Sequence, residues 1–152
     1  MKLLLCLILP SLMLEASFGD VLWRGGSPDA RLSLAAGPPP LGNWFGAEGD
    51  ELSFTLKSGD SFVAFQVGMV GPVTGLLREG LAANARNRGK TTSGCTIKFR
   101  EDGAIDLTFK QSKELTVRIS REDARELIRV STAFLDERMA KHAKLEKNAD
   151  LD

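Results

Sequence analysis

The side chains that most often build catalytic sites are scarce in this sequence of 152 residues. It has one histidine, His142, two cysteines, Cys6 and Cys95, and no tyrosine. A lone imidazole lacks the second group that a metal site or an oriented base needs, and His142 lies in a charged segment typical of solvated surface. No Gly-x-Ser-x-Gly nucleophile motif occurs. We therefore expect no catalytic residues, no metal site and no cofactor; an enzyme would need converging carboxylates that the spacing does not predict.

The sequence contains adjacent carboxylates and a segment similar to a phosphate-binding loop, but neither forms a complete motif for acid–base catalysis or nucleotide binding. The carboxylates of Asp50-Glu51 and of Glu101-Asp102 are adjacent in sequence, and neighbours on a strand point to opposite faces, so neither pair predicts acid–base catalysis. Arg88-Gly89-Lys90-Thr91 resembles the end of a phosphate-binding Gly-x-x-x-x-Gly-Lys-Thr loop. Asn84 stands where the first glycine should be, and the segment leaves a predicted helix to enter a strand, the reverse of the required order. A nucleotide site is not predicted.

Positive charge is concentrated in the middle of the chain. Residues 78–121 hold ten lysines and arginines against five aspartates and glutamates, whereas residues 20–77 and 122–152 are both net negative. The chain as a whole has no formal net charge, so no global field draws it to nucleic acid or anionic lipid. A polyanionic partner should therefore contact the middle segment.

The segments around these charges have the periodicity of strands and short helices. Residues 51–57 alternate apolar and polar side chains, and a turn at Ser58-Gly59-Asp60 joins them to a more apolar strand over residues 61–67, which predicts a hairpin. Leucines at helical spacing predict a helix over residues 75–86. Three more strands follow, the first two joined by a tight turn at Asp102-Gly103.

A long helix is predicted after the last strand. Ser120 is a suitable N-cap, Asp123 can return the capping hydrogen bond, and Glu122 favours the positive end of the helix dipole. The apolar stripe of this helix comprises Ala124, Leu127, Ile128, Ser131, Leu135 and Met139, widened by Phe134. The sequence thus predicts an α+β fold: an antiparallel sheet in the order β-β-α-β-β-β-α, with the long C-terminal helix packed on one face.

Strand periodicity then predicts where the basic side chains lie. The apolar set expected to face the helix is Ile97, Phe99, Ile105, Leu107, Phe109, Leu115, Val117 and Ile119. Period two sends their neighbours to the other face, namely Lys98, Arg100, Asp106, Thr108, Lys110, Thr116 and Arg118, which is four positive charges against one negative. The loop with Arg86, Arg88 and Lys90 leads into this face. Such a surface can bind a phosphate backbone, although stacking aromatics are few and Phe62 is the nearest candidate. The alternative is a solvated sheet face without a ligand.

The N-terminus has the plan of a cleaved signal peptide. Lys2 precedes about a dozen mostly apolar residues, a run shorter than the roughly 20 residues of a membrane span and interrupted by Pro10. Ser17 and Gly19 fit cleavage before Asp20; cleavage after residue 16 or 17 is the alternative, and a buried N-terminal strand or helix is another. We expect entry into the secretory pathway, ending in secretion or in an organelle such as a secondary plastid, because residues 16–18 are similar to plastid leader junctions.

The expected layout has four parts. Residues 1–19 form the signal peptide, residues 20–50 an irregular Gly- and Pro-rich arm held by Trp23 and Trp44, residues 51–140 the α+β domain, and residues 141–152 a charged, frayed tail. Removal of the leader leaves Cys95 without an intramolecular disulfide partner, so a small buried thiol is expected there.

Two stretches resemble the PC4/Whirly group of single-stranded-nucleic-acid-binding domains. Residues 54–71, Phe-Thr-Leu-Lys-Ser-Gly-Asp-Ser-Phe-Val-Ala-Phe-Gln-Val-Gly-Met-Val-Gly, look like the Whirly hairpin, and residues 115–128, Leu-Thr-Val-Arg-Ile-Ser-Arg-Glu-Asp-Ala-Arg-Glu-Leu-Ile, look like its last strand and helix start. The basic Lys-Gly-Lys-Ala stretch of plant Whirly proteins is absent, and a predicted helix over residues 75–86 stands where strands are expected. The resemblance implies single-stranded DNA or RNA binding through the sheet, commonly by a homo-oligomer.

Two functional hypotheses follow. The first is a non-catalytic module that binds single-stranded nucleic acid through Arg86, Arg88, Lys90, Lys98, Arg100, Lys110 and Arg118. The second is a secreted interaction or structural domain that binds a protein or membrane surface through its C-terminal helix, which could pair between protomers. Neither predicts a small-molecule substrate or a membrane-spanning segment in the mature chain.

Overall fold

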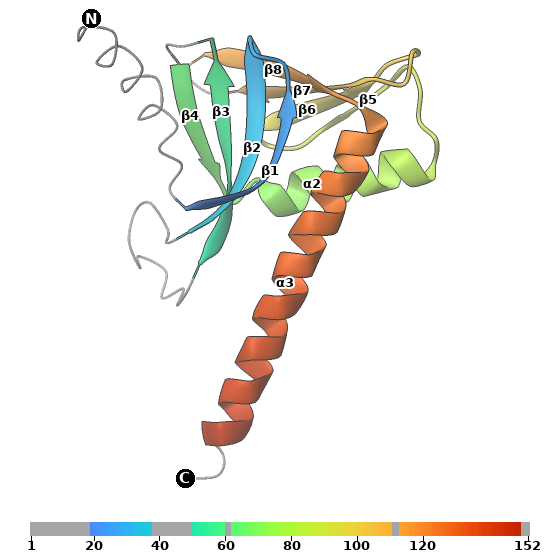
Figure 1. The fold of residues 1–152 in the computed structure, drawn as a ribbon. Helices are drawn as coiled ribbons and strands as arrows, with labels where there is room; N and C mark the ends of the chain where they lie inside the picture. The colour runs from blue at the N-terminus through green and yellow to red at the C-terminus, as the bar shows by residue number, and fades with distance from the viewer. Residues whose placement is uncertain (1–18, 38–49, 60–61, 111–112, 150–152) are drawn as a thin grey trace, which may run out of the picture.

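The computed structural model describes residues 19–37, 50–59, 62–110 and 113–149 as an α+β fold of antiparallel sheets. The strands are β1 (Asp20–Gly26), β2 (Ala30–Gly37), β3 (Glu51–Ser58), β4 (Phe62–Val67), β5 (Arg88–Thr91), β6 (Cys95–Phe99), β7 (Ile105–Lys110) and β8 (Glu114–Ile119); the helices are α2 (Val70–Ala82) and the long C-terminal α3 (Arg121–Ala149) (Figure 1). The predicted fold class, the β3–β4 hairpin and the β6–β7–β8 meander are confirmed.

The strands form two sheets rather than one. The first has the order β1-β2-β3-β4 and the second β5-β6-β7-β8, with α2 connecting them. The sheets meet where β1 and β2 lie beside β8 (Figure 1). Two glycines at the end of β1 permit this approach: a Cβ on Gly25 would lie 3.2 Å from Cγ2 of Ile119, and one on Gly26 would lie 2.8 Å from Cγ1 of Val117. The second sheet also has an edge strand, β5, in a segment that the sequence predicted as a loop.

Residues 20–37 are part of the domain, which corrects the prediction of an irregular arm. They form β1 and β2, and the extended pieces expected at residues 21–24 and 31–35 lie within these strands. Trp23, Leu32 and Leu34 are buried in the main core, so the domain begins well before residue 51. Residues 1–18 of the predicted leader over residues 1–19, the part of the arm over residues 38–49 with Trp44, and the last three residues lie outside the described residues.

Helix α2 starts five residues earlier than leucine periodicity predicted. Pro72 falls in its first turn, where a missing backbone N–H removes no intrahelical hydrogen bond, so the Gly/Pro-rich stretch opens the helix instead of preceding it. The helix ends at Ala82 because Asn84 adopts a left-handed conformation with φ of 47°. Asn84 N–H donates to the Leu81 carbonyl and Ala85 N–H to the Gly80 carbonyl, which is a Schellman cap.

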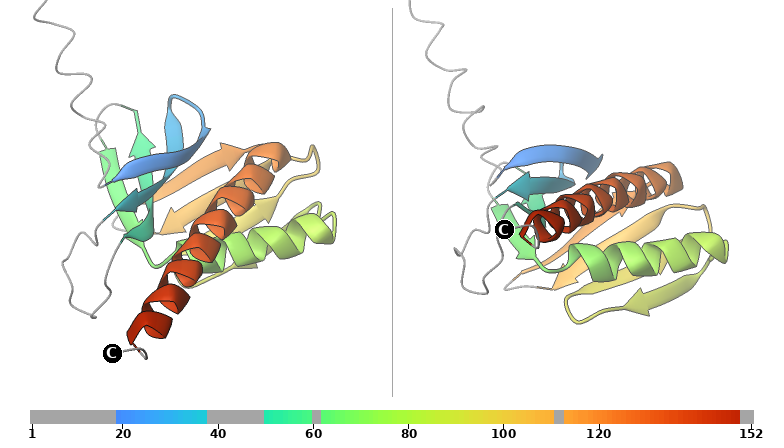
Figure 2. Two further views of the ribbon diagram at one scale, coloured as in Figure 1. Left: turned by 60° about the horizontal axis from the view of Figure 1, so that its bottom comes forward. Right: turned by 90° about the horizontal axis from the view of Figure 1, so that it is seen from below.

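One hydrophobic core joins both sheets and both helices. All eight apolar positions predicted for the inner face of β6, β7 and β8 are buried, at 9% exposure or less. Phe54 of the first sheet meets Phe109 of the second edge-to-face, with ring centroids 5.9 Å apart. Leu77 of α2 and Leu127 of α3 belong to the same core, and both helices lie across the inner face of the second sheet (Figure 2).

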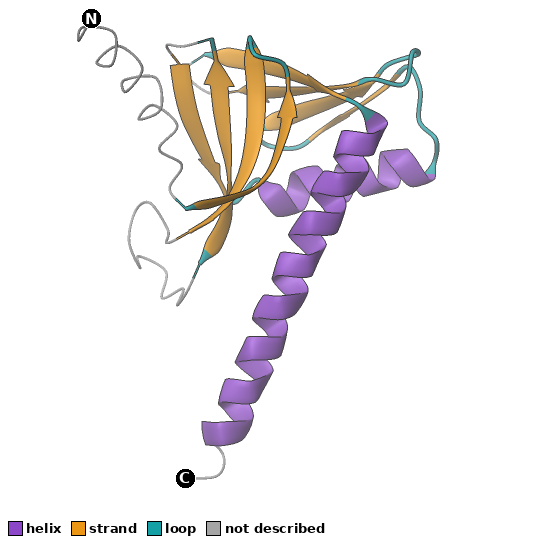
Figure 3. Cartoon of the chain, viewed as in Figure 1, coloured by secondary structure: helices purple, strands orange, loops and turns teal. Residues whose placement is uncertain are grey.

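Helix α3 begins at the predicted cap and continues far beyond its packed part. Ser120 Oγ accepts from Asp123 N–H at 2.9 Å, while Asp123 Oδ2 accepts from Ser120 N–H at 3.4 Å. The buried positions of the helix end at Ser131, yet the helix continues to Ala149 and projects past both sheets (Figure 3). The predicted frayed tail is therefore helical over residues 141–149, as expected for a stretch of Ala, Lys and Glu with a Glu137–Lys141 ion pair at i, i+4.

Candidate nucleic-acid interface

The outer face of the second sheet gathers four of the seven predicted cationic side chains. Because directly opposed residues of antiparallel strands share a face, the cross-strand pairs Lys98↔Asp106 and Asp106↔Arg118 form one row on the side away from the helices. Arg100, which follows β6, contacts Asp106 from the same side. Lys110 lies on this face near the other end of β7. We call the set Lys98, Arg100, Lys110 and Arg118 the outer basic face.

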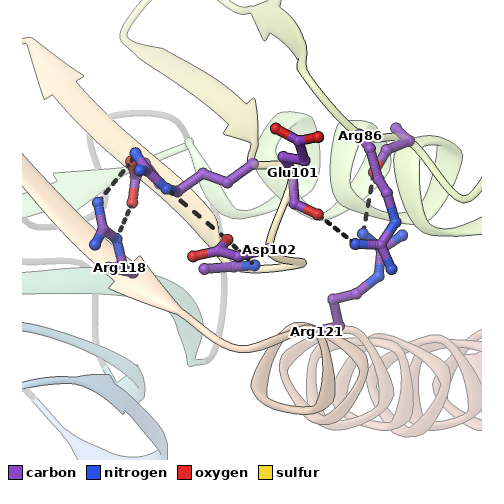
Figure 4. A network of polar contacts seen from close by, with 9 residues as sticks. Arg86, Glu101, Asp102, Arg118 and Arg121 are labelled. Carbon is purple, nitrogen blue, oxygen red and sulfur yellow. Dashed lines mark hydrogen bonds and ion pairs between the residues drawn. The ribbon is translucent and has the colours of Figure 1, made fainter.

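Two of these cations are held by a carboxylate beneath them. Arg118 Nε donates to Asp106 Oδ1 at 2.7 Å and its Nη2 to Oδ2 at 3.3 Å, while Arg100 Nη1 donates to the same Oδ2 at 3.1 Å (Figure 4). The side chain of Asp106 is only 12% exposed, whereas those of Arg100 and Arg118 are 37% and 58% exposed. The carboxylate therefore forms the floor of this cluster, and the guanidinium groups form its surface.

The pKa values in the cluster follow from these contacts. Hydrogen bonding from Arg118 lowers the pKa of Asp106, an effect opposed by burial and reinforced by Arg100. The same hydrogen bond raises the pKa of Arg118. Asp106 is therefore ionised at neutral pH, and it offsets part of the positive charge of the two arginines.

The two lysines of the outer basic face are more accessible. Lys98 is exposed and lies beside a shallow surface hollow lined by Asn87, Lys98, Arg100, Glu101 and Asp102. Lys110 is exposed and stands directly opposite Glu114 in the register. Sequence reasoning missed Glu114, although it has the same period-two position as Thr116 and Arg118. The face thus carries four cations and two carboxylates, and Asp102 of the β6–β7 turn forms a further ion pair with Arg100 at 3.9 Å, so the net charge is smaller than predicted.

A row of threonines crosses all four strands next to the charged row. The register aligns Thr91 with Thr96, Thr96 with Thr108, and Thr108 with Thr116. The hydroxyl oxygens are 3.4 Å apart in the first pair and 2.8 Å apart in the last. This row provides hydroxyl groups that can donate to phosphate oxygens.

Arg88 and Lys90 lie on the opposite face, which corrects the predicted continuous surface. They belong to β5 and pair with Phe99 and Ile97, so they share the face that those apolar residues occupy. Lys90 accordingly forms an ion pair with Glu79 of α2. The sequence prediction failed because a loop has no fixed sidedness, whereas a paired strand has.

Arg86 has a structural position at the end of the second sheet. Its guanidinium donates to the Glu101 carbonyl in the β6–β7 turn, and the neighbouring Arg121 donates to the Ala85 carbonyl at 3.0 Å (Figure 4). These contacts hold the exit of α2 against the turn and the start of α3. Part of the Arg86 guanidinium is therefore committed to a backbone contact, so Arg86 is not counted in the outer basic face.

Aromatic side chains do not contribute to the described outer face of the second sheet. Its two phenylalanines, Phe99 and Phe109, are buried in the core. Phe62, the nearest candidate from the sequence, belongs to β4 of the first sheet and not to the sheet that carries the basic face. Among the described side chains, a ligand on the outer basic face would meet cations, hydroxyls and a few carboxylates, but no aromatic ring.

The other groups that could have chemistry form no metal or nucleophile cluster within the described residues, although His142 lines a surface hollow with Asp50, Glu137 and Lys141. His142 lies on the exposed half of α3, and no described group of three histidines, cysteines or carboxylates could hold a metal ion. Cys95 is buried at 1% exposure, and burial raises the pKa of its thiol to about 12. The predicted buried thiol is confirmed.

No protein-family model, curated protein or solved structure matches the chain. Among the described helices, none combines the length and the apolar character that crossing a membrane requires.

Proposed function

We propose that this protein is a non-catalytic module that binds the backbone of single-stranded DNA or RNA through its outer basic face. The observation that supports this most is the placement of Lys98, Arg100, Lys110 and Arg118 on the water-facing side of a sheet whose other side buries eight apolar side chains in the core. The resemblance of residues 54–71 and 115–128 to PC4/Whirly domains favours a single strand over a duplex.

Binding should be weak and mainly electrostatic. With two accessible lysines and two arginines already shared with Asp106, the face can neutralise roughly two to four phosphates, so log K should fall against log salt with a slope of about −1.4 to −2.8. Without aromatic platforms, binding should depend little on base identity.

The direct test is titration of fluorescein-labelled oligothymidine, followed by fluorescence anisotropy, at several salt concentrations. We expect binding at low salt with the slope given above, and similar affinity for oligoadenosine. Absence of binding at low salt would refute the proposal, and a salt-independent affinity would show that phosphate contacts are not its basis.

A second candidate function is self-association through α3, for which the exposed apolar residues of its free half are the specific observation. Leu135, Met139 and Leu145 are 44%, 71% and 65% exposed. They continue the apolar stripe of α3, whose earlier members Ala124 and Leu127 are buried in the core. A second copy of the chain could cover them. Sedimentation velocity tests this: a dimer that dissociates in Leu135→Ser/Met139→Ser supports it, whereas a monomer at all concentrations refutes it.

The compartment of the mature protein bears on both candidates. We propose that residues 1–19 direct the chain into the secretory pathway, after which it is secreted or enters an organelle that contains nucleic acid. N-terminal sequencing of the protein from its source, together with its location by cell fractionation, tests this proposal. An uncleaved Met1 would contradict it.

A further inference from the structure

In the ion cluster formed by Arg100, Asp106 and Arg118, the carboxylate lies deeper in the protein than the two guanidinium groups. Asp106, 8% exposed, lies at the floor, and the more exposed guanidinium groups of Arg100 and Arg118 lie above it. A ligand arriving from solvent would meet the guanidinium groups before it met the carboxylate.

The hydrogen bonds of this cluster use only part of each guanidinium. Within the described part of the chain, Arg118 contacts Asp106 through Nε and Nη2. Arg100 contacts Asp106 through Nη1, and its Nε forms a longer ion pair with Asp102 Oδ1 at 3.9 Å. Arg118 Nη1 and Arg100 Nη2 keep their donors for another acceptor. A tetrahedral oxyanion such as a phosphodiester is an acceptor that can use donors from two guanidinium groups at once.

Asp106 also reduces the electrostatic repulsion between Arg100 and Arg118. Both donate to its Oδ2 atom, at 3.1 Å from Arg100 and 3.3 Å from Arg118, which brings two like charges close together. Without the carboxylate between them, these long side chains would repel each other and sample many rotamers.

We propose that Asp106 is a positioning residue that assembles Arg100 and Arg118 into one oxyanion subsite for a backbone phosphate. This inference rests on the proposed function and deepens it. Because the two side chains are ordered before the ligand arrives, binding loses less conformational entropy. The negative charge of Asp106 therefore favours binding of a polyanion, which is the opposite of what net charge alone predicts.

Asp106→Asn tests the proposal against Glu101→Gln as its matched control. Each change removes one negative charge near the face, but Glu101 is an exposed turn residue whose carbonyl, not its carboxylate, contacts Arg86. At the low salt concentration at which the wild type binds, we expect Asp106→Asn to bind oligothymidine roughly three- to tenfold more weakly than the wild type, and Glu101→Gln to bind as well or slightly better. Arg118→Lys is a surface change that keeps the positive charge but loses the planar guanidinium with its paired N–H donors, and it should also weaken binding.

The outcomes separate the two proposals. If the wild type binds oligothymidine but Asp106→Asn, shown to be folded by circular dichroism, binds as tightly or more tightly, the positioning role is refuted and the proposed function stands. Arg118→Lys with unchanged affinity would refute the positioning role as well, without any question of folding. If the wild type does not bind, the proposed function fails and this inference fails with it.

Discussion

Gly80 of α2 packs directly against the ring of Phe99 in β6: a Cβ atom at Gly80 would lie 2.0 Å from Phe99 Cζ. This contact lets the helix approach the second sheet closely enough to bury Leu77 and Val73 completely. Helix α2 therefore packs on the side of the second sheet opposite the outer basic face. A side chain larger than that of glycine at position 80 would prevent this close packing.

Gly80→Ala should destabilise the domain. The added methyl group would have to displace the Phe99 ring, which we expect to lower the free energy of unfolding by about 1–3 kcal/mol. Gly75→Ala in the same helix is the control, because a Cβ there meets nothing within 4 Å and alanine favours the helix by roughly 0.5–1 kcal/mol. Urea unfolding followed by circular dichroism measures the free energy of unfolding of both variants. Equal changes of the same sign in Gly80→Ala and Gly75→Ala would contradict the packing of Gly80 against Phe99.

Trp23→Ala should show that residues 20–37 belong to the folded domain. Trp23 is 6% exposed in the core, so we expect a loss of about 3–5 kcal/mol in the free energy of unfolding. Leu22→Ala, on a neighbour that is 37% exposed, should cost far less. If Trp23→Ala unfolded at the same urea concentration as the wild type, β1 would be a peripheral arm after all.

Acid should remove the contribution of Asp106 to stability. Its folded pKa is lowered, mainly by the hydrogen bond from Arg118, so its stabilising contribution is complete above the unfolded pKa of about 3.9 and is lost as the pH falls through the folded value. The difference in Tm between the wild type and Asp106→Asn should therefore shrink as the pH falls below about 4. A difference that grew on acidification would contradict the ionised, paired state of Asp106.

Cys95 should resist alkylation in the native protein. Burial raises its thiol pKa to about 12, so almost no reactive thiolate exists at neutral pH. Iodoacetamide should label Cys95 only after denaturation, as measured by mass spectrometry. Rapid labelling of the folded protein would indicate an exposed thiol and would favour a redox role.

The sequence predicted the elements that have strong periodicity. Alternation in residues 97–119 placed eight apolar residues in the core and their neighbours on the outer face, and Ser120 with Asp123 marked the start of α3. These signals are local, because each depends only on side-chain spacing or on one capping hydrogen bond.

The features that the sequence did not predict depend on tertiary contacts. The Gly- and Pro-rich composition of residues 20–50 indicated an irregular arm, yet Gly25 and Gly26 permit the close approach of β1 to β8. The sidedness of Arg88 and Lys90 depended on the pairing of β5 with β6, which no short-range pattern reports. Pro72 indicated a break, although the first turn of a helix accepts proline.

The most direct test of the account compares neutralising substitutions on two faces of the protein. Lys98→Gln/Lys110→Gln removes two charges from the outer basic face, and Arg88→Gln/Arg125→Gln removes two exposed charges elsewhere, so both variants have the same net charge. In anisotropy titrations with oligothymidine at low salt, the first variant should lose most of the affinity and about half or more of the salt slope, whereas the second should bind nearly as the wild type does. Equal losses in both variants, or a larger loss in the second, would contradict binding through the outer basic face.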